Sequence, residues 1–153
     1  MKQSAGILLY RFHNDSLQVF LVHPGGPFWA RKDAGAWTIP KGEPMPGEEL
    51  LAAARRELAE ETGFRPDGTF IGLNPVRQKG GKLVHAWALA ADVDPLLMQS
   101  NSFEIEWPPR SGKRQQFPEV DKAGWFTIEE ARVKVLPAQL DLLTQLEELL
   151  AKH

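Results

Sequence analysis

The 153-residue sequence contains no cysteine, which excludes disulfides, thiolate nucleophiles and zinc sites built from cysteine. It has no apolar run near the roughly 18 residues of a membrane-spanning helix, and no signal-peptide pattern at its start. The 18 basic and 20 acidic residues give a net charge of -2, so a broad basic surface for DNA or membranes is not expected. These absences favour a cytoplasmic protein with no DNA or membrane partner, in which any RNA contact is local.

Several common catalytic motifs are missing as well. The sequence has no G-x-S-x-G, no P-loop and no HExxH, so it gives no support for the corresponding hydrolases, NTPases and zinc proteases. A length of 153 residues suits one domain over residues 1–153. Both a monomer and a homodimer remain open.

The most informative segment is residues 42–64. Apolar residues recur at helical spacing up to Gly63, a typical helix end, and this predicts a helix over residues 47–62. Glu57, Glu60 and Glu61 then project from one face, where like charges cost a few tenths of a kcal/mol per pair unless a cation compensates. Hard divalent cations prefer such carboxylate oxygens. The alternative is an ordinary solvated acidic face, which is common on helices.

The same segment occupies every specified position of the pattern G-x5-E-x7-R-E-U-x-E-E-x-G-U, where U is a bulky apolar residue. The matching residues are Gly42, Glu48, Arg56, Glu57, Leu58, Glu60, Glu61, Gly63 and Phe64. This pattern resembles the Nudix box, and the chain is similar to the Nudix hydrolases, which cleave pyrophosphate linkages in nucleoside diphosphates joined to another group. The resemblance implies an α/β protein with the Nudix fold, an α/β/α sandwich with a mixed β-sheet.

The resemblance also implies roles for the box residues. The metal, Mg²⁺ or Mn²⁺, would be bound by Glu57, Glu60, Glu61 and the carbonyl of Gly42. Arg56 would pair with Glu48 and hold the helix against the preceding loop. The implied catalytic set is Arg56, Glu57, Glu60, Glu61 and Glu48. The metal would polarise phosphoryl oxygens and lower the pKa of the attacking water, and a carboxylate would act as general base.

The resemblance leaves the base either within the box or on a neighbouring loop, because Nudix proteins differ in where the base lies, and they often add a carboxylate from a later strand or loop. The candidates are Glu104, Glu106, Glu119 and Asp121. Glu106 and Glu119 flank the basic, proline-bearing residues 108–118, which places them ahead of the other two. For each acid the alternative is an exposed side chain with no role at the site.

Substrate contacts are suggested by two further segments. Trp37-Thr38-Ile39-Pro40-Lys41-Gly42 resembles the W-x-x-P-K-G of the diadenosine polyphosphate hydrolase branch, so Lys41 and Trp37 are expected to bind substrate. The alternative for these two residues is a packed Trp and a surface Lys. Arg110, Lys113 and Arg114 suit a phosphate chain, or else belong to a solvated loop. Phe103 and Trp107 are candidates to stack on a base.

These features predict a Mg²⁺-dependent hydrolase of a pyrophosphate linkage in a nucleotide, with a dinucleoside polyphosphate as the favoured substrate. Other substrates with the same chemistry are RNA 5′ ends, modified nucleoside triphosphates and diphosphoinositol polyphosphates. An alternative of another class is a non-catalytic nucleotide-binding Nudix module, which the intact box argues against.

The rest of the chain predicts the elements around the box. A hairpin is expected over residues 5–22, further strands at 37–40, 69–78, 83–91, 103–107 and 120–126, and an exposed loop at 108–118. Thr127 and Glu130 form a capping-box pattern for a short helix. Leucines between residues 140 and 150 predict an amphipathic final helix.

Overall fold

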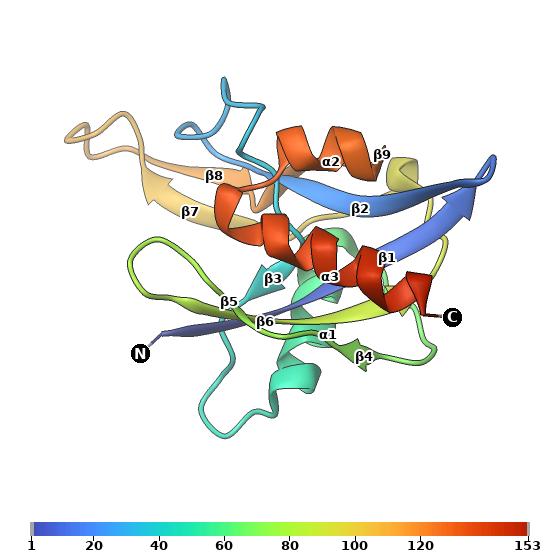
Figure 1. Cartoon of the computed structure of the whole chain (residues 1–153). Coiled ribbons are helices and arrows are strands. Elements are labelled where there is room, and N and C mark those ends of the chain that lie inside the picture. Colours follow the sequence, from blue (N-terminus) through green and yellow to red (C-terminus); the bar gives the residue numbers. More distant parts are fainter. Residues whose placement is uncertain (1, 153) are drawn as a thin grey trace.

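The computed structural model describes residues 2–152 and contains nine strands and three α-helices in that range (Figure 1). The strands are β1 (Gln3–His13), β2 (Ser16–Pro24), β3 (Lys41–Gly42), β4 (Ile71–Gly72), β5 (Val76–Arg77), β6 (Leu83–Ala90), β7 (Ser102–Glu106), β8 (Arg114–Pro118) and β9 (Val120–Thr127). The helices are α1 (Leu50–Thr62), α2 (Ile128–Lys134) and α3 (Leu140–Ala151), with 3-10 turns at Pro95–Leu97 and Pro137–Gln139. No helix in the described range is long and apolar enough to cross a membrane.

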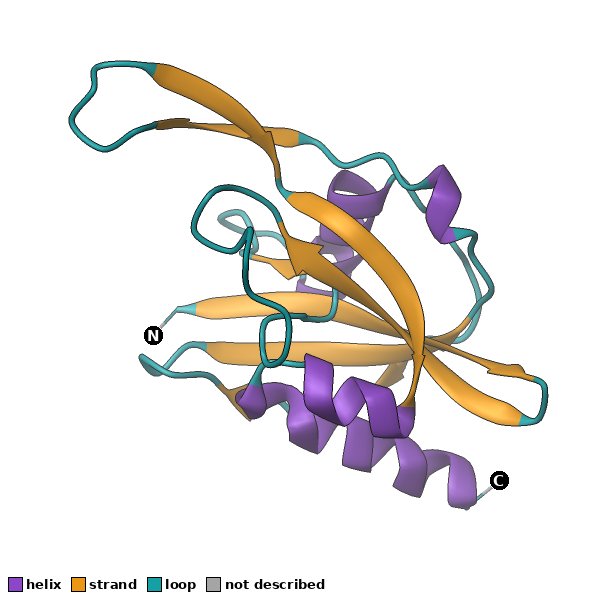
Figure 2. Cartoon of the chain, turned by 90° about the horizontal axis from the view of Figure 1, so that it is seen from above, coloured by secondary structure: helices purple, strands orange, loops and turns teal. Residues whose placement is uncertain are grey.

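The main sheet is mixed and has the strand order β4-β6-β1-β2-β9. Strands β1 and β6 are parallel, and the other pairs are antiparallel. The short strand β3 pairs with the start of β1, opposite Ala5 and Gly6, whereas β2 pairs with the end of β1. Strands β7 and β8 form a separate two-stranded sheet that projects from the body (Figures 1 and 2). This split of β1 between two partners places β3 beside helix α1.

Helices cover both faces of the main sheet, with α2 and α3 on one side and α1 on the other (Figure 2). The alternation of side chains along β1 explains the two cores. Leu8 packs in the cluster that contains the α3 leucines, whereas Ile7 and Leu9 pack in the cluster that contains Ala54 and Leu58 of α1. The architecture is therefore the expected α/β/α sandwich with a mixed sheet.

Most predicted elements are present, and four differ from the prediction. The strand predicted at residues 37–40 is not formed, because Trp37 and Thr38 make only isolated bridges and the strand β3 follows at Lys41–Gly42. The box helix ends at Gly63 with a φ of 81°, as expected, but begins at Leu50 rather than Gly47, which has a φ of 78°. The strand predicted at residues 69–78 is divided into β4 and β5, both paired with β6. The loop predicted at residues 108–118 is half strand, because β8 pairs with β7. The capping box at Thr127 is confirmed.

Candidate functional site

Strand β3 brings Lys41 and Gly42 against the acidic face of α1. The backbone N–H of Lys41 donates to Glu61 Oε1 at 3.3 Å. A Cβ atom at Gly42 would lie only 2.0 Å from the carboxylate of Glu57, so this position accepts no side chain without displacing Glu57. Glycine here therefore allows β3 to pack closely on the box carboxylates.

The guanidinium of Arg56 organises the acidic residues around it. Its Nε and Nη2 donate to the two carboxylate oxygens of Glu48, each at 2.9 Å. Its Nη1 donates to Glu57 at 3.0 Å and to Glu60 at 2.9 Å. The bonds from Arg56, together with the N–H of Met45, lower the pKa of Glu48 to about 2. Such a forked pairing fixes orientation as well as charge, and it matches the pairing implied by the resemblance.

Three carboxylates of the site have raised pKa values. Burial, with repulsion from Glu57, raises the pKa of Glu61 to about 8. The pKa of Glu57 is raised by burial and by the charge of Glu60, and the pKa of Glu119 is raised by the same two causes. Four acids from two distant parts of the sequence thus share one low-dielectric region, and their mutual repulsion favours a cation there.

Glu119 reaches the box because the segments flanking β7 and β8 are bonded to α1. The N–H of Asn101 donates to the carbonyl of Glu60 at 2.9 Å, and the N–H of Glu119 donates to the carbonyl of Asn101 at 2.9 Å. With its amide in the orientation that satisfies both neighbours, Asn101 also donates to Glu119 Oε2 at 3.2 Å. Sequence reasoning missed Asn101, because no local pattern predicts this contact.

The residues present fit a hard divalent cation, although the part of the chain that the structure describes holds no preformed cage. Within residues 2–152, no group of three or more His, Asp and Glu side chains has the spacing of a metal site. Arg56 explains this, because its Nη1 lies between the carboxylates of Glu57 and Glu60. The donor set is nevertheless all oxygen and carries excess negative charge, which suits Mg²⁺ or Mn²⁺.

Lys41 is half-buried and lies near charged side chains of both signs. Burial, and then the charge of Lys82, lower the pKa of Lys41, while Glu61, Glu57 and Glu43 act in the opposite direction. Lys82 is itself paired with Glu43 at 3.4 Å. The structure therefore places the lysine of the W-x-x-P-K-G segment beside the box carboxylates.

Trp37 requires a correction, because it does not lie on an accessible surface. Its ring is 7% exposed, packs edge-on against Phe126 and His23, and donates from Nε1 to Asp33 at 2.7 Å. A side chain in this position supports the segment that leads to Lys41. It is not available to contact substrate.

The other predicted residues lie on the β7–β8 arm, defined here as residues 102–118, or next to it. Glu106 accepts from the backbone N–H groups of Arg110 and Gly112 and does not join the box acids. Arg110 and Lys113 are exposed in the turn of the arm, and Arg114 is paired with Glu104. Asp121 lies beyond the arm and bonds to His23 Nδ1 at 2.7 Å. Of the acids proposed outside the box, the structure brings only Glu119 to it.

A cavity of about 310 Å³ lies on the outer side of α1, next to the segment that follows the helix. It is lined by Arg55, Arg56, Leu58, Ala59, Glu60, Arg65, Pro66 and Phe70. The guanidinium of Arg55 lies 4.9 Å from the centroid of the Phe70 ring. Sequence reasoning missed Arg55 and Arg65, whose only signal is that they flank the box acids.

Comparison with known proteins gives relatives for both the sequence and the fold. The chain is 46% identical over 56 residues to an RNA pyrophosphohydrolase of Caulobacter vibrioides, a match that covers 33% of each chain. It therefore spans about a third of the length of that curated relative. A C. elegans Ap4A hydrolase has a similar fold, with a TM-score of 0.70, 24% identity and full coverage of both chains. The NUDIX domain of Shewanella oneidensis NrtR, complexed with ADP ribose, gives a TM-score of 0.64 at 21% identity, covering 98% of this chain and 88% of that one.

A family model extends the relationship over nearly the whole sequence. The NUDIX domain model matches residues 2–146, which include the box, β3 and Glu119. The box pattern, the α/β/α sandwich and this match all indicate the same family. The chain belongs to the NUDIX domain family.

Proposed function

We propose that the protein is a Mg²⁺-dependent hydrolase that cleaves a pyrophosphate linkage in a nucleotide, with a dinucleoside polyphosphate as its favoured substrate. The observation that carries this proposal is the packing of Gly42 on the carboxylate of Glu57, with Glu61 and Glu119 in the same region of raised pKa values. A structural ion-pair network would leave few carboxylates uncompensated. Here only part of the negative charge is neutralised, by Arg56 and by the nearby Lys41.

The roles of the residues follow from their positions. Glu57, Glu60 and Glu61 would hold the metal, which supplies charge stabilisation at the phosphoryl oxygens and a lowered pKa for water. Arg56 fixes Glu48, Glu57 and Glu60 by hydrogen bonds, so it orients carboxylates that would otherwise repel one another.

Two residues beside the box carboxylates would act on the substrate and the water. Lys41 lies where it can neutralise a substrate phosphate. Glu119 would accept the proton of the attacking water, because a carboxylate with a raised pKa is a better base near neutral pH.

RNA 5′ ends are the second candidate substrate. The observation in its favour is the 46% identity to an RNA pyrophosphohydrolase over 56 residues. The likeness of fold to an Ap4A hydrolase and the W-x-x-P-K-G segment support the dinucleoside polyphosphate. Both substrates present a polyphosphate joined to a nucleoside, so the same carboxylates would act on either.

Product analysis in Mg²⁺ tests the proposal. The panel contains diadenosine tetraphosphate, nucleoside triphosphates, nucleotide sugars, diphosphoinositol polyphosphates and 5′-triphosphate RNA. We expect ATP and AMP from diadenosine tetraphosphate, and a loss on the order of 10³-fold in kcat for Glu61→Gln, because a ligand of the reacting centre is removed. Glu129→Gln, an exposed acid on α2, is the matched control and should keep full activity. A wild-type protein that binds nucleotides but leaves the whole panel intact would instead be a binding module.

A further inference from the structure

The β7–β8 arm begins and ends at the candidate active site. Asn101, just before β7, donates to the carbonyl of Glu60, and Glu119, just after β8, is bonded to Asn101. The N–H of Gly25 donates to the carbonyl of Glu119 at 2.8 Å, which joins the same point to the loop at residues 25–36. The arm and this loop therefore extend outward from the box carboxylates as neighbours.

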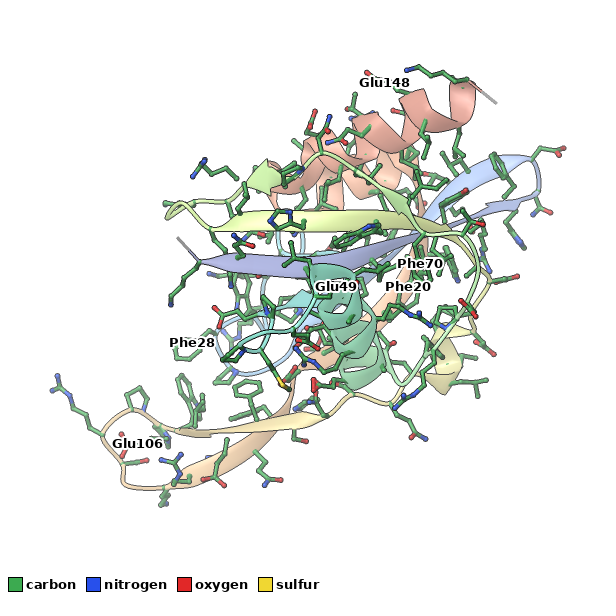
Figure 3. All side chains as sticks on the ribbon, turned by 90° about the horizontal axis from the view of Figure 1, so that it is seen from below. Phe20, Phe28, Glu49, Phe70, Glu106 and Glu148 are labelled. Carbon is green, nitrogen blue, oxygen red and sulfur yellow. The ribbon has the colours of Figure 1, made fainter. Side chains whose placement is uncertain are left out.

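One face of the arm is aromatic and turns toward that loop. Phe103 and Phe117 are opposite each other in the strand register, with ring centroids 6.1 Å apart. The Phe103 ring lies against Gly26, where an added Cβ would be 2.8 Å away. Farther out, Trp107 packs edge-on against Phe28 of the loop with centroids 5.3 Å apart. Figure 3 shows Phe28 on the loop and Glu106 on the arm below it, both away from α1.

Phe28 contributes little to the core, because its side chain is 64% exposed. Neither Phe28 nor Trp107 belongs to the two buried clusters of the sandwich. Phe28 thus presents an exposed aromatic ring at the outer half of the arm, with Trp107 packed edge-on against it. An exposed aromatic ring stacks on any nucleobase.

The turn at the end of the arm is held in one conformation. The carboxylate of Glu106 accepts from the N–H groups of Arg110 and Gly112, each at 3.1 Å. The N–H of Trp107 donates to the carbonyl of Lys113 at 2.8 Å. Within residues 2–152, the side chains of Arg110 and Lys113 form no ion pair, whereas Arg114 is neutralised by Glu104. Two cationic side chains without an ion-pair partner among the described residues therefore lie in this turn, which also holds the carboxylate of Glu106.

We propose that this arm, together with Phe28, binds the distal nucleotide of a dinucleoside polyphosphate whose reacting phosphates lie at the box carboxylates. The inference rests on the proposed function and adds the site that binds the second nucleoside of its substrate. Ser102 to Glu106 spans four strand steps of about 3.4 Å, so the aromatic pair lies about 14 Å from the base of the arm. A nucleoside monophosphate at the box does not cover that span. A bridging polyphosphate with a second nucleoside reaches it, with phosphates near Arg110 and Lys113 and a base on Phe28.

Equilibrium binding separates this inference from the proposed function, because it requires no turnover. The affinities of diadenosine tetraphosphate and of AMP are measured in Ca²⁺ for wild type, Phe28→Ala and the double variant Arg110→Ala/Lys113→Ala. We expect each variant to lose at least tenfold more affinity for the dinucleotide than for AMP. The controls are Phe12→Ala, which has the same 64% exposure at the far hairpin, and Lys79→Ala/Lys152→Ala, which removes two exposed charges elsewhere. Both controls should bind each ligand like wild type.

Three outcomes would overturn the inference. Equal losses for the two ligands would mean that the arm acts only on the box. A loss confined to a 5′-triphosphate oligoribonucleotide, titrated in parallel, would assign the arm to RNA. A shift of the variants in sedimentation equilibrium would identify the arm as a contact between copies of this chain. Absence of hydrolysis by wild type, with the expected binding pattern intact, would count against the proposed function alone.

Discussion

Glu61 carries the largest raised pKa among the acids of the site, and its position makes the metal-free protein sensitive to pH. Its pKa rises from an ordinary 4.5 to about 8, chiefly because it is buried and next to Glu57. A raised carboxyl pKa means that folding favours the protonated form. The corresponding stability is complete below pH 4.5 and is lost as the pH rises through 8.

We therefore expect the free energy of unfolding of the metal-free protein to fall between pH 5 and pH 8.5. The decrease should be on the order of 2 kcal/mol. This is less than the whole pKa shift would give at about 1.4 kcal/mol per pKa unit, because solvent and neighbouring groups relax around the charge. Urea titrations at several pH values measure it. Glu61→Gln should flatten much of the dependence, and Mg²⁺ should stabilise wild type more at pH 8.5 than at pH 5. Equal pH profiles for wild type and the variant would contradict the assignment to Glu61.

A substitution at Gly42 tests the close approach of β3 to α1. In Gly42→Ala the new methyl group would lie 2.0 Å from the Glu57 carboxylate, so this carboxylate must shift from its position. We expect kcat/KM to fall on the order of 100-fold, because a misplacement of about 1 Å has that effect on a reacting centre. Steady-state kinetics and thermal unfolding are measured together. Gly124→Ala is the control, since its Cβ would meet only ordinary contacts at 3.5 Å. A Gly42→Ala protein with wild-type kinetics would show that Glu57 is not needed in this position.

At the scale of elements, helix α1 depends on Arg56 to hold acids that repel one another. Arg56→Lys keeps the charge but loses the forked donation of Nε and Nη2 to Glu48 that accompanies the bonds of Nη1 to Glu57 and Glu60. We expect a loss of about 1–3 kcal/mol in stability, as for other charged hydrogen bonds, and a decrease on the order of 10- to 100-fold in kcat/KM.

Arg55→Lys is the matched control for Arg56→Lys. It makes the same replacement one position away, where the side chain is 51% exposed and its ion pair to Asp67 spans 3.9 Å. Calorimetry and kinetics on both variants decide the matter. Equivalent behaviour of the two would show that the fork of Arg56 has no special role.

The elements that the sequence predicts best are those with a local cause. Helix α1 follows from its apolar spacing and its terminal glycine, and α2 begins at Thr127 because of its capping box. Strand β8 was missed because residues 114–118 show no alternation of apolar and polar side chains. They become a strand only by pairing with β7. The burial of Trp37 could not be predicted either, because its neighbours Phe126 and His23 are distant in sequence. Contacts of this kind depend on the tertiary fold, as does the approach of Asn101 and Glu119 to the box.

For the whole molecule, Gln139 joins the C-terminal helical layer to the segment that carries Lys41 and Gly42. Its side chain is 1% exposed, accepts from the N–H of Ile39 at 3.0 Å and donates to Thr38 Oγ1 at 2.8 Å. The next residue, Pro40, accepts from the N–H of Ile7 at 3.1 Å, so the segment is fixed between α3 and β1 just before the site. A buried side chain opposite α1 thus sets the position of β3.

Gln139→Leu preserves the volume and removes these bonds, leaving the N–H of Ile39 buried without a partner. We expect the free energy of unfolding to fall by about 1–3 kcal/mol. The loss of kcat/KM should be similar in proportion for every substrate, because β3 is loosened rather than any substrate contact removed. Denaturant titrations and kinetics on two substrates test this, with the exposed Gln3→Leu as the control expected to stay within about 0.5 kcal/mol of wild type. If Gln139→Leu were destabilised while retaining full activity, the position of β3 would not depend on the C-terminal layer, and β1 alone would hold the site together.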